Sequence, residues 1–231
     1  MRKPPAPMYP KSSGRLGVPL AEQAYQYLKH TLIDGGYKAG ERISVDELAK
    51  AIGASRQPVM DAIRRLEAEG LLTIIPQVGT LVSTADVTEV QDFFRFLGLA
   101  EGHLGMLAAE RGSNEEVARL LALVDSYPLT NGDQHDRIVR YRLHNRAFHQ
   151  LIHEMARSPL IHQVAVGLWD KTDFYVNTLY ADSGFVSRED DGIDEHRRIA
   201  EAIQRRDGLA VDEEIQRHIM AFANDRHRIG A

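Results

Sequence analysis

The sequence predicts a mainly α-helical protein in two parts: a small N-terminal domain with three helices and a β-hairpin, then an all-α bundle of six to seven helices. Two observations carry this prediction. Residues 44–83 have the pattern of a helix, a tight turn, a second helix and a short hairpin, and helical periodicity fills the rest of the chain. A length of 231 residues is sufficient for two cores, although length alone does not fix the number of domains.

The N-terminal domain is predicted to span residues 18–83, after a flexible tail at residues 1–17 with four prolines among its first ten residues. Its first helix ends at the pair Gly35-Gly36, because glycine is a common stop signal after a helix. The apolar positions of this helix recur at helical spacing and outline one buried face. They are Leu20, Ala24, Tyr27, Leu28 and Leu32.

The next two helices have recognisable start and stop signals. Ser44 is a good N-cap with a glutamate three residues later, and Gly53 ends the helix that it begins. Ser55 is placed to cap the following helix, in which Pro58 falls in the first turn, where a missing N–H costs little. The spacing therefore predicts two short helices joined by a tight turn.

A short hairpin follows the third helix. Two β-prone runs, residues 71–75 and 80–83, flank a turn at residues 76–79 that contains Pro and Gly. A three-helix core followed by such a hairpin is a winged helix-turn-helix, so this domain is predicted to bind DNA.

The polar face of the third helix carries the residues predicted to contact DNA. Arg56 and Gln57 lie near the N-terminus of the helix, where such side chains reach base edges in the major groove. Arg64 or Arg65 is placed to hold a phosphate. Any one of these could be an ordinary solvated residue, and it is the ordered combination of caps, turn and hairpin that favours DNA binding.

Five segments of this domain appear in the order of a known family: Gly40-Glu41-Arg42, Glu47-Leu48-Ala49, Ser55-Arg56-Gln57-Pro58-Val59, the run from Arg65 to Leu71, and Gly79. They resemble the N-terminal domain of GntR-type bacterial transcription regulators. The resemblance implies that Arg56 and Gln57 read the operator and that the wing tip at Gly79 approaches the minor groove. Ser55, at the start of the same helix, joins the predicted DNA contacts.

The chain departs from the family pattern at three positions. Met60 stands where the family usually has arginine, and Val78 where it frequently does. Asp61 replaces an acidic residue that is often glutamate. Two customary DNA-contacting arginines are therefore missing, which calls the usual operator sequence into question.

Charge and composition agree with this division of the chain. Residues 1–83 carry 11 Lys and Arg against 8 Asp and Glu, whereas residues 84–231 carry 17 against 25. A mildly positive head on an acidic body suits a protein that contacts DNA with one end. The sequence has no long apolar run and no signal-peptide pattern, so no membrane partner is expected. The absence of cysteine excludes disulfides and thiolate metal sites, and the expected location is cytoplasmic.

Residues 84–231 are predicted to form an all-α effector-sensing domain. Breaks in the helical pattern near residues 112, 127–132, 158–159, 182–184 and 207–208 divide it into roughly six helices. The apolar stripe of its first helix is assigned to the core and to no chemistry. This stripe consists of Phe93, Phe96, Leu97, Leu104, Leu107 and Ala108.

Three of the ten histidines, His149, His196 and His218, lie beside the apolar stripes of three different predicted helices. Asn145 precedes His149 by one turn, so both project from one helix face. Imidazoles on facing helices can hold a divalent metal, and zinc is favoured, with nickel, manganese or iron as alternatives. A single histidine at a core edge is more often a structural residue, and the residues alone do not link the three.

The run Asn145-Arg146-Ala147-Phe148-His149, with His196 in Asp194-Glu195-His196 and the later His218, resembles the FCD type of ligand-sensing domain found in one GntR branch. The metal-binding members have an Asp-x-x-x-His run and two later histidines. The resemblance implies a metal site at Asn145, His149, His196 and His218, with Asn in place of Asp. An amide ligand should lower metal affinity, alter metal preference, or mark a pocket that no longer needs metal.

The same resemblance implies that a small organic acid binds in the helical cavity, with its carboxylate meeting the metal and nearby side chains. The three histidines favour a sugar acid or dicarboxylate over a fatty-acyl ligand, which would call for a wide apolar cavity without metal. The candidate lining residues are Arg95, His103, Arg142, Arg146, His153, Tyr175 and Asn177.

The sequence therefore predicts a homodimeric transcription regulator, by preference a repressor, that binds a palindromic operator and responds to a small carboxylate. One alternative is a regulator with a metal-free pocket for a larger acyl ligand. Another is a metal-dependent hydrolase fused to a DNA-binding head, which would need a general base such as Glu101, Glu154 or Glu195. No spacing marks any of these three, so no catalytic residue and no enzymatic activity are predicted.

Overall fold

The structure, a computed structural model, describes residues 17–128, 134–179 and 189–223. Within these ranges the chain forms nine helices and one three-stranded sheet, which confirms the predicted mainly α fold. The described residues group into two compact units, residues 17–85 with 170–179, and residues 86–169 with those after 188. No helix in these ranges is long and apolar enough to cross a membrane.

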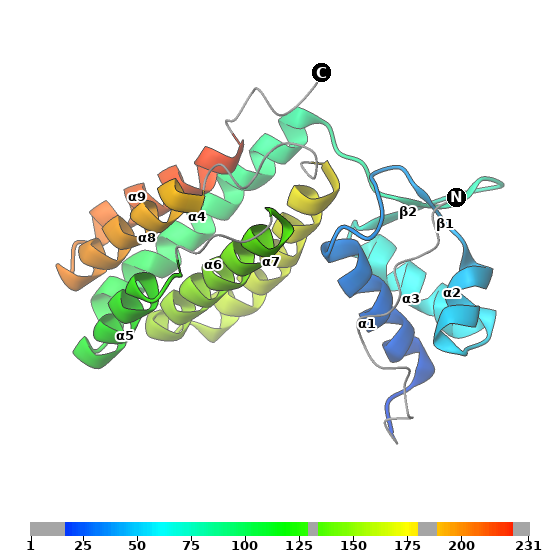
Figure 1. The fold of residues 1–231 in the computed structure, drawn as a ribbon, viewed down its shortest axis with the longest axis horizontal. Helices are drawn as coiled ribbons and strands as arrows, with labels where there is room; N and C mark the ends of the chain where they lie inside the picture. Colours follow the sequence, from blue (N-terminus) through cyan, green and yellow to red (C-terminus); the bar gives the residue numbers. More distant parts are fainter. Residues whose placement is uncertain (1–16, 129–133, 180–188, 224–231) are drawn as a thin grey trace. The chain divides into compact units, whose positions relative to one another are not determined.

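The first unit is a winged helix-turn-helix (Figure 1). Its sheet has the order β1-β3-β2 with both pairs antiparallel, and Ile75 pairs with Gly79 across the hairpin. The final turns of α7, from Asp170, belong to this unit. Its complete elements are α1 (Leu20–Ile33), β1 (Arg42–Ile43), α2 (Val45–Ile52), α3 (Arg56–Ala68), β2 (Leu72–Ile75) and β3 (Gly79–Val82).

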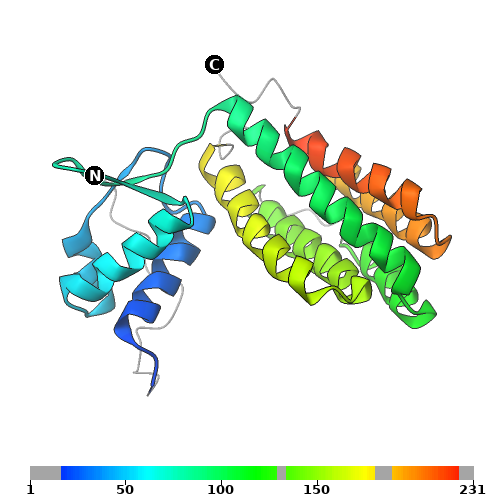
Figure 2. The same cartoon turned by 180° about the vertical axis from the view of Figure 1, so that it is seen from behind.

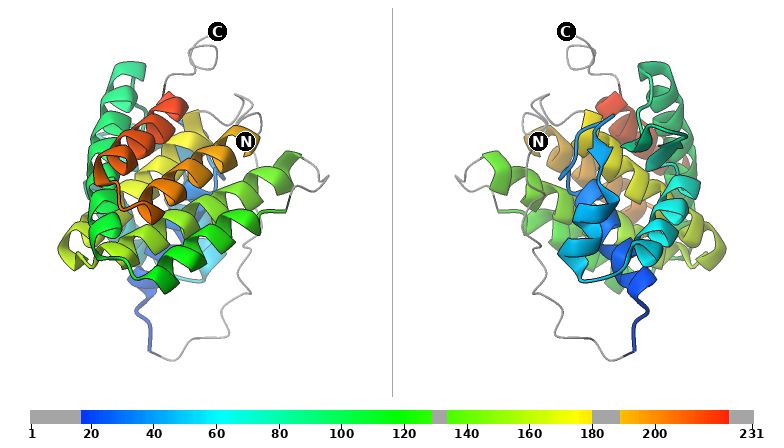
Figure 3. Two further views of the ribbon diagram at one scale, coloured as in Figure 1. Left: turned by 90° about the vertical axis from the view of Figure 1, so that its left-hand side faces the viewer. Right: turned by 90° about the vertical axis from the view of Figure 1, so that its right-hand side faces the viewer.

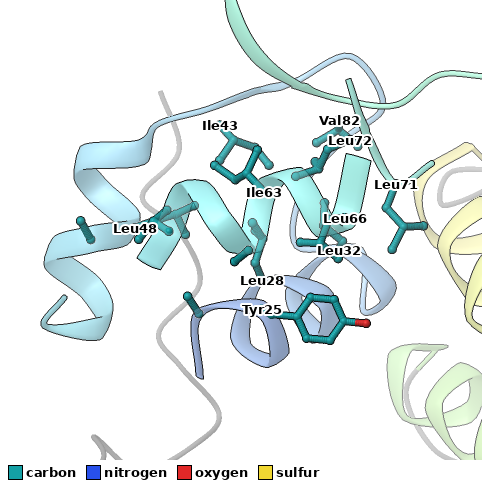
Figure 4. Packing of buried hydrophobic residues seen from close by; sticks show 14 of the residues in the cluster. Tyr25, Leu28, Leu32, Ile43, Leu48, Ile63, Leu66, Leu71, Leu72 and Val82 are labelled. Carbon is teal, nitrogen blue, oxygen red and sulfur yellow. The ribbon is translucent and has the colours of Figure 1, made fainter. Parts of the chain in front are cut away.

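The core of the first unit is centred on α1 and α3 (Figure 4). Leu28 and Leu32 of α1 meet Ile63 and Leu66 of α3, and all four side chains are at most 1% exposed. Phe174 of α7 joins the same cluster. Burying an aliphatic side chain of this size contributes about 1.5–3 kcal/mol, so α3 is anchored firmly by its apolar face and its polar face is left exposed.

Local capping explains where the two central helices begin. Ser44 Oγ accepts a hydrogen bond of 3.3 Å from the backbone N–H of Glu47, and Gly53 ends α2 with φ +68°, a conformation that glycine adopts without strain. Ser55 occupies the N-cap position of α3, but its side chain makes no capping hydrogen bond. The predicted cap is therefore wrong in this detail, because the Ser55 hydroxyl does not reach the first amides of α3.

The second unit is all-α: six helices follow residue 85 in the described ranges, in agreement with the prediction. Asp86 and Ser113 begin the first two of these helices with complete capping boxes. The last two helices of the unit are neighbours (Figure 3). The six are α4 (Val87–Arg111), α5 (Asn114–Asp125), α6 (Gln134–Ala156), α7 (Pro159–Leu179), α8 (Glu189–Gln204) and α9 (Gly208–Ala223).

Helix α4 packs along α9, as Figures 1 and 2 show from opposite sides. Glycines on α4 allow this close approach. A Cβ atom added to Gly105 would lie 2.4 Å from Cδ1 of Ile215 and 2.6 Å from Cγ1 of Val211. The absence of a side chain at Gly105 therefore allows α9, which carries His218, to pack closely against α4, which carries Glu101.

The burial of α4 differs from the predicted stripe at one aromatic position. Phe96 is 56% exposed, whereas Phe94, which the stripe left out, is 1% exposed. Leu97 and Leu104 are fully buried as predicted. Because α4 contacts α6, α8 and α9, its buried surface is wider than a single one-sided stripe.

We expect Gly105→Ala to destabilise the second unit. Alanine favours a helix over glycine by about 1 kcal/mol, but overpacking a tight helix contact costs about 1–3 kcal/mol, and here two side chains would have to move. Gly167 is the matched control, since it is exposed on α7 and a Cβ there meets nothing within 4 Å. Urea unfolding followed by circular dichroism should show stabilisation for Gly167→Ala; equal effects at both sites would contradict this packing argument.

Candidate nucleic-acid interface and metal centre

Polar and basic side chains on the exposed face of α3 make solvent-exposed ion pairs and hydrogen bonds with nearby acidic residues. Arg56 Nη1 lies 2.5 Å from Oδ1 of Asp46, and Gln57 Nε2 donates to Oδ1 of Asp61 at 2.9 Å. Arg64 Nη1 lies 3.8 Å from the same Asp61 oxygen. Exposed ion pairs are worth about 0–1 kcal/mol, so DNA can compete for these side chains at little cost.

The N-terminus of α3 is open to an anion. Ser55 is exposed there and leaves the first amides of the helix without a side-chain cap. Free amides and the helix dipole together favour a phosphate at such a position. Ser55, Arg56, Gln57 and Arg64 are thus brought together by the structure on one accessible face.

A groove of 810 Å³ separates the wing from α2 and α3. Met60 of α3 lines it, as does Val78 of the wing, which is 47% exposed. Gly79 has φ +119°, and a Cβ there would lie 3.2 Å from Nε of Arg42. Arg42 was given no role from the sequence, but it is exposed beside the wing and has no ion-pair partner among the described residues.

Arg65 lies apart from this face. Its guanidinium carbon is 3.5 Å from the centre of the Tyr25 ring, and Nη1 is 2.6 Å from Oε2 of Glu22. Both partners belong to α1, so stacking and charge hold α3 against α1 through this side chain. Arg65 was predicted as a phosphate contact; its side chain is 51% exposed while it packs on α1, and a contact with phosphate stays a prediction.

Three histidines converge in the second unit: His149 of α6, His196 of α8 and His218 of α9. All are at most 1% exposed. Each offers a ring nitrogen, and these nitrogens lie within 4.8 Å of one another. The structure thus links three residues whose separate positions on predicted helices could not be related from the sequence.

Carboxylates orient two of the three rings. His149 Nδ1 is 2.9 Å from Oε2 of Glu101, and His218 Nδ1 is 2.7 Å from Oε2 of Glu195. An ionised carboxylate only accepts hydrogen bonds, so both Nδ1 atoms donate, and Nε2 is the nitrogen of each ring that is left to bind a metal. Such outer partners typically fix the tautomer of metal-binding histidines.

The third ring is oriented by the predicted ligand Asn145. Its Oδ1 lies 2.9 Å from Nε2 of His196 and accepts a hydrogen bond from that ring, and the role of Asn145 as a metal ligand stays a prediction. Nε2 of His149 and Nδ1 of His196 are buried without a hydrogen-bond partner in the described part of the chain. Buried nitrogens without hydrogen-bond partners, on histidines whose ligand atoms lie within 4.8 Å of one another, fit a divalent cation that prefers imidazole, such as zinc.

The protonation states suit such an ion. Burial lowers the pKa of His149, and it lowers the pKa of His196 well below its usual value with the help of the neighbouring rings. Burial would raise the pKa of Glu101, but hydrogen bonds from His149 and His153 outweigh it and hold the pKa at about 2. At neutral pH the rings of His149 and His196 are therefore neutral beside an ionised carboxylate, the state in which these side chains bind metal best.

Glu101 is the most densely bonded side chain near the site. It is 0% exposed and accepts hydrogen bonds from Nδ1 of His149, from Nε2 of His153 at 2.9 Å and from Nε1 of Trp169 at 2.8 Å. A carboxylate with so many donors and such a low pKa is a poor general base, so this geometry gives no support to a hydrolase.

Two of the predicted effector residues line a cavity of 220 Å³ beside the histidine cluster. Arg146 and His153 share this cavity with His149 and Trp169. Arg142 is half-buried on the same helix, α6, but does not line the cavity.

The other four predicted effector residues lie elsewhere. Arg95 and His103 are exposed on α4, where Arg95 pairs with Asp92. Tyr175 and Asn177 belong to the first unit: Tyr175 packs on the winged-helix core, and the Asn177 amide donates to a backbone carbonyl of α1. Helical spacing placed these residues on predicted helices but could not show which neighbour each helix face meets.

Comparison with known proteins identifies both units. Residues 20–82 match the family described as bacterial regulatory proteins, gntR family, and residues 92–221 match the FCD domain. The chain belongs to the GntR family and carries an FCD domain. It is accordingly a transcription regulator, and its GntR domain implies DNA binding.

Several relatives match this GntR-family protein over most of their length. It is 26% identical to the HTH-type transcriptional regulator YdhC of Bacillus subtilis over 209 residues, covering 90% of this chain and 89% of YdhC. The Escherichia coli repressor GlaR is 26% identical over 200 residues, covering 85% and 90% of the two chains. The structure of E. coli McbR/YncC has a TM-score of 0.70 at 22% identity, covering 91% of this chain and 99% of that one, which supports the fold.

We expect metal-free protein to lose stability as the pH falls from 7.5 to 5.5. The unfolded chain takes up protons below the ordinary histidine pKa of 6.5, whereas the lowered pKa values of buried His149 and, more strongly, His196 oppose proton uptake in the folded state. A histidine that stayed neutral over the whole range would cost about 1.4 kcal/mol, which is the upper limit for each of the two. The lowered pKa of Glu101 acts only below about pH 4.5, outside the range.

Urea unfolding in EDTA at the two pH values measures this effect. His196→Gln should remove the contribution of His196 to the loss of unfolding free energy between pH 7.5 and 5.5. His103→Gln, which replaces an exposed histidine, should leave the wild-type pH dependence unchanged. A wild-type stability that is equal at pH 7.5 and 5.5 would show that the buried rings accept protons freely.

Proposed function

We propose that this regulator acts in the cytoplasm as a homodimeric repressor that binds a palindromic operator, and that a small carboxylate effector bound at or near a metal site controls its operator affinity. The observation that carries the proposal is the convergence of three buried imidazoles within 4.8 Å in a domain linked to a winged helix-turn-helix. The repressive sign is supported by relatives named as repressors, GlaR and RspR of E. coli.

The donor set explains why the effector should be an anion. His149, His196 and His218 would hold the ion, with zinc favoured and nickel, manganese or iron as alternatives. Three neutral ligands leave the charge of a divalent cation uncompensated in the first coordination sphere, since Asn145 brings an amide where metal-binding relatives of this type have a carboxylate. A bound ion would supply a positive charge and an open coordination position for a carboxylate oxygen.

Control of DNA affinity requires two arrangements of the dimer. A palindromic operator presents two half-sites at a fixed spacing, so two winged domains must be held at the matching distance. The effector shifts this balance only if it binds one arrangement more tightly, by about 1.4 kcal/mol for each tenfold change in operator affinity.

If Arg56 reads bases, Arg56→Ala should reduce the preference for operator over unrelated DNA by about 5- to 150-fold, equivalent to about 1–3 kcal/mol. Arg64→Ala is the matched comparison from the same helix face. As a phosphate contact, Arg64 should weaken binding to both DNAs equally and reduce the salt dependence by about one phosphate contact.

Fluorescence anisotropy with operator and scrambled duplexes at several salt concentrations distinguishes the two effects. Circular dichroism checks that both variants fold, as expected because both side chains are exposed. Unchanged selectivity in Arg56→Ala would remove Arg56 from base recognition.

If the histidine cluster binds metal, protein purified without a His tag should contain close to one ion per chain by elemental analysis. The double variant His149→Ala/His196→Ala should contain none. Glu101→Gln should weaken zinc affinity about 10- to 100-fold, because an amide cannot accept from all the donors that the carboxylate serves.

Competition with a chromogenic chelator measures the zinc affinity. Glu154→Gln is the control, because Glu154 is exposed on the same helix as His149 and should leave the affinity unchanged. A wild-type protein that stays metal-free at saturating zinc would favour a purely structural role for the three histidines.

A further inference from the structure

A second group of buried nitrogens without hydrogen-bond partners lies on α6, outside the histidine cluster. Nε and Nη2 of Arg140 are buried and have no partner within the described ranges. The same is true of Nδ1 of His144, which follows one helical turn later. Residues at this spacing share one face of a helix.

The two nitrogens of Arg140 form a specific recognition element. Nε and Nη2 lie on one edge of the planar guanidinium and point two N–H donors in nearly parallel directions. This edge matches the two oxygens of a carboxylate, which it binds through paired hydrogen bonds. A buried donor left unmet costs about 1–3 kcal/mol, and more when it is charged, so the edge is suited to an anion that arrives from outside the chain.

His144 offers the complementary group, an acceptor. Its Nε2 lies 3.0 Å from the backbone oxygen of Leu123, which can only accept, so Nε2 donates and the neutral ring keeps a lone pair on Nδ1. A lone pair repels a carboxylate oxygen but accepts a hydrogen bond from a hydroxyl group. The ring centre of His144 is 5.9 Å from that of His196, so this acceptor lies next to the proposed metal centre.

We infer that Arg140 and His144 form a recognition subsite for a hydroxycarboxylate. The carboxylate binds the Nε and Nη2 edge of Arg140, and a hydroxyl of the same molecule donates to Nδ1 of His144. A carboxylate without a hydroxyl group would leave Nδ1 of His144 without a hydrogen-bond donor. A neutral polyol would leave the guanidinium of Arg140 without an anionic partner. The inference rests on the proposed function, because it names the chemical class of its effector.

Matched pairs of acids test the subsite on the full chain, with and without EDTA. The probes are lactate with propionate, malate with succinate, and galactonate with hexanoate. Thermal-shift titration should give at least one hydroxy acid that binds wild type about tenfold or more tightly than its deoxy partner. This comparison needs no mutation and therefore does not depend on the folding of a variant.

Two conservative variants separate the two contacts. Arg140→Lys keeps the charge but loses the paired donors, so affinity for both acids of the responding pair should fall tenfold or more. His144→Gln can still donate to Leu123 from the position of Nε2 but has no acceptor at the position of Nδ1, so the preference for the hydroxy acid should disappear. Arg205→Lys, at an exposed position, is the control and should bind like wild type.

The outcomes distinguish this inference from the proposed function. If acids bind but the hydroxyl gives no advantage, or if Arg140→Lys binds like wild type, the subsite is wrong while a carboxylate effector stands. If wild type binds none of the six acids, the carboxylate effector and the subsite are both rejected.

Discussion

The second unit is organised around the buried carboxylate of Glu101. An ionised group in a protein interior is costly unless its oxygens are fully hydrogen-bonded. Glu101 of α4 meets this requirement with His149 and His153 of α6 and Trp169 of α7. These helices must therefore keep one register, and the same hydrogen bonds fix the tautomer in which His149 presents Nε2 to its neighbours.

Close packing of α4 on α9 completes this arrangement. Gly105 allows Ile215 to approach so closely that α9 brings His218 to the face already formed by α6 and α8. Glu195 then orients His218 as Glu101 orients His149. Helix packing supplies the positions of the rings, and the surrounding acceptors supply their orientation, so the site is preorganised by the fold.

The first unit was predictable because its signals are local. Caps, glycine stops and a hairpin turn follow one another along residues 44–83, and each needs only a few neighbouring residues. The histidine cluster differs, because periodicity assigns a residue to a helix face but does not show which helices face one another. Glu101 did leave a signal, since it stands at helical spacing between Leu97 and Leu104, where a charged residue requires buried partners.

The two units hold their binding groups in different electrostatic states. Arg56 and Gln57 are exposed and bonded to nearby acids, so in the proposed complex DNA would replace these acids as their partner, and salt would weaken the contact of the charged Arg56. Arg140 and His196 carry buried nitrogens whose desolvation occurred on folding, so a ligand that meets them gains hydrogen bonds without that cost. Operator affinity should therefore vary strongly with ionic strength, whereas the affinity of the proposed effector would depend on how well a small molecule fits atoms that are already in place.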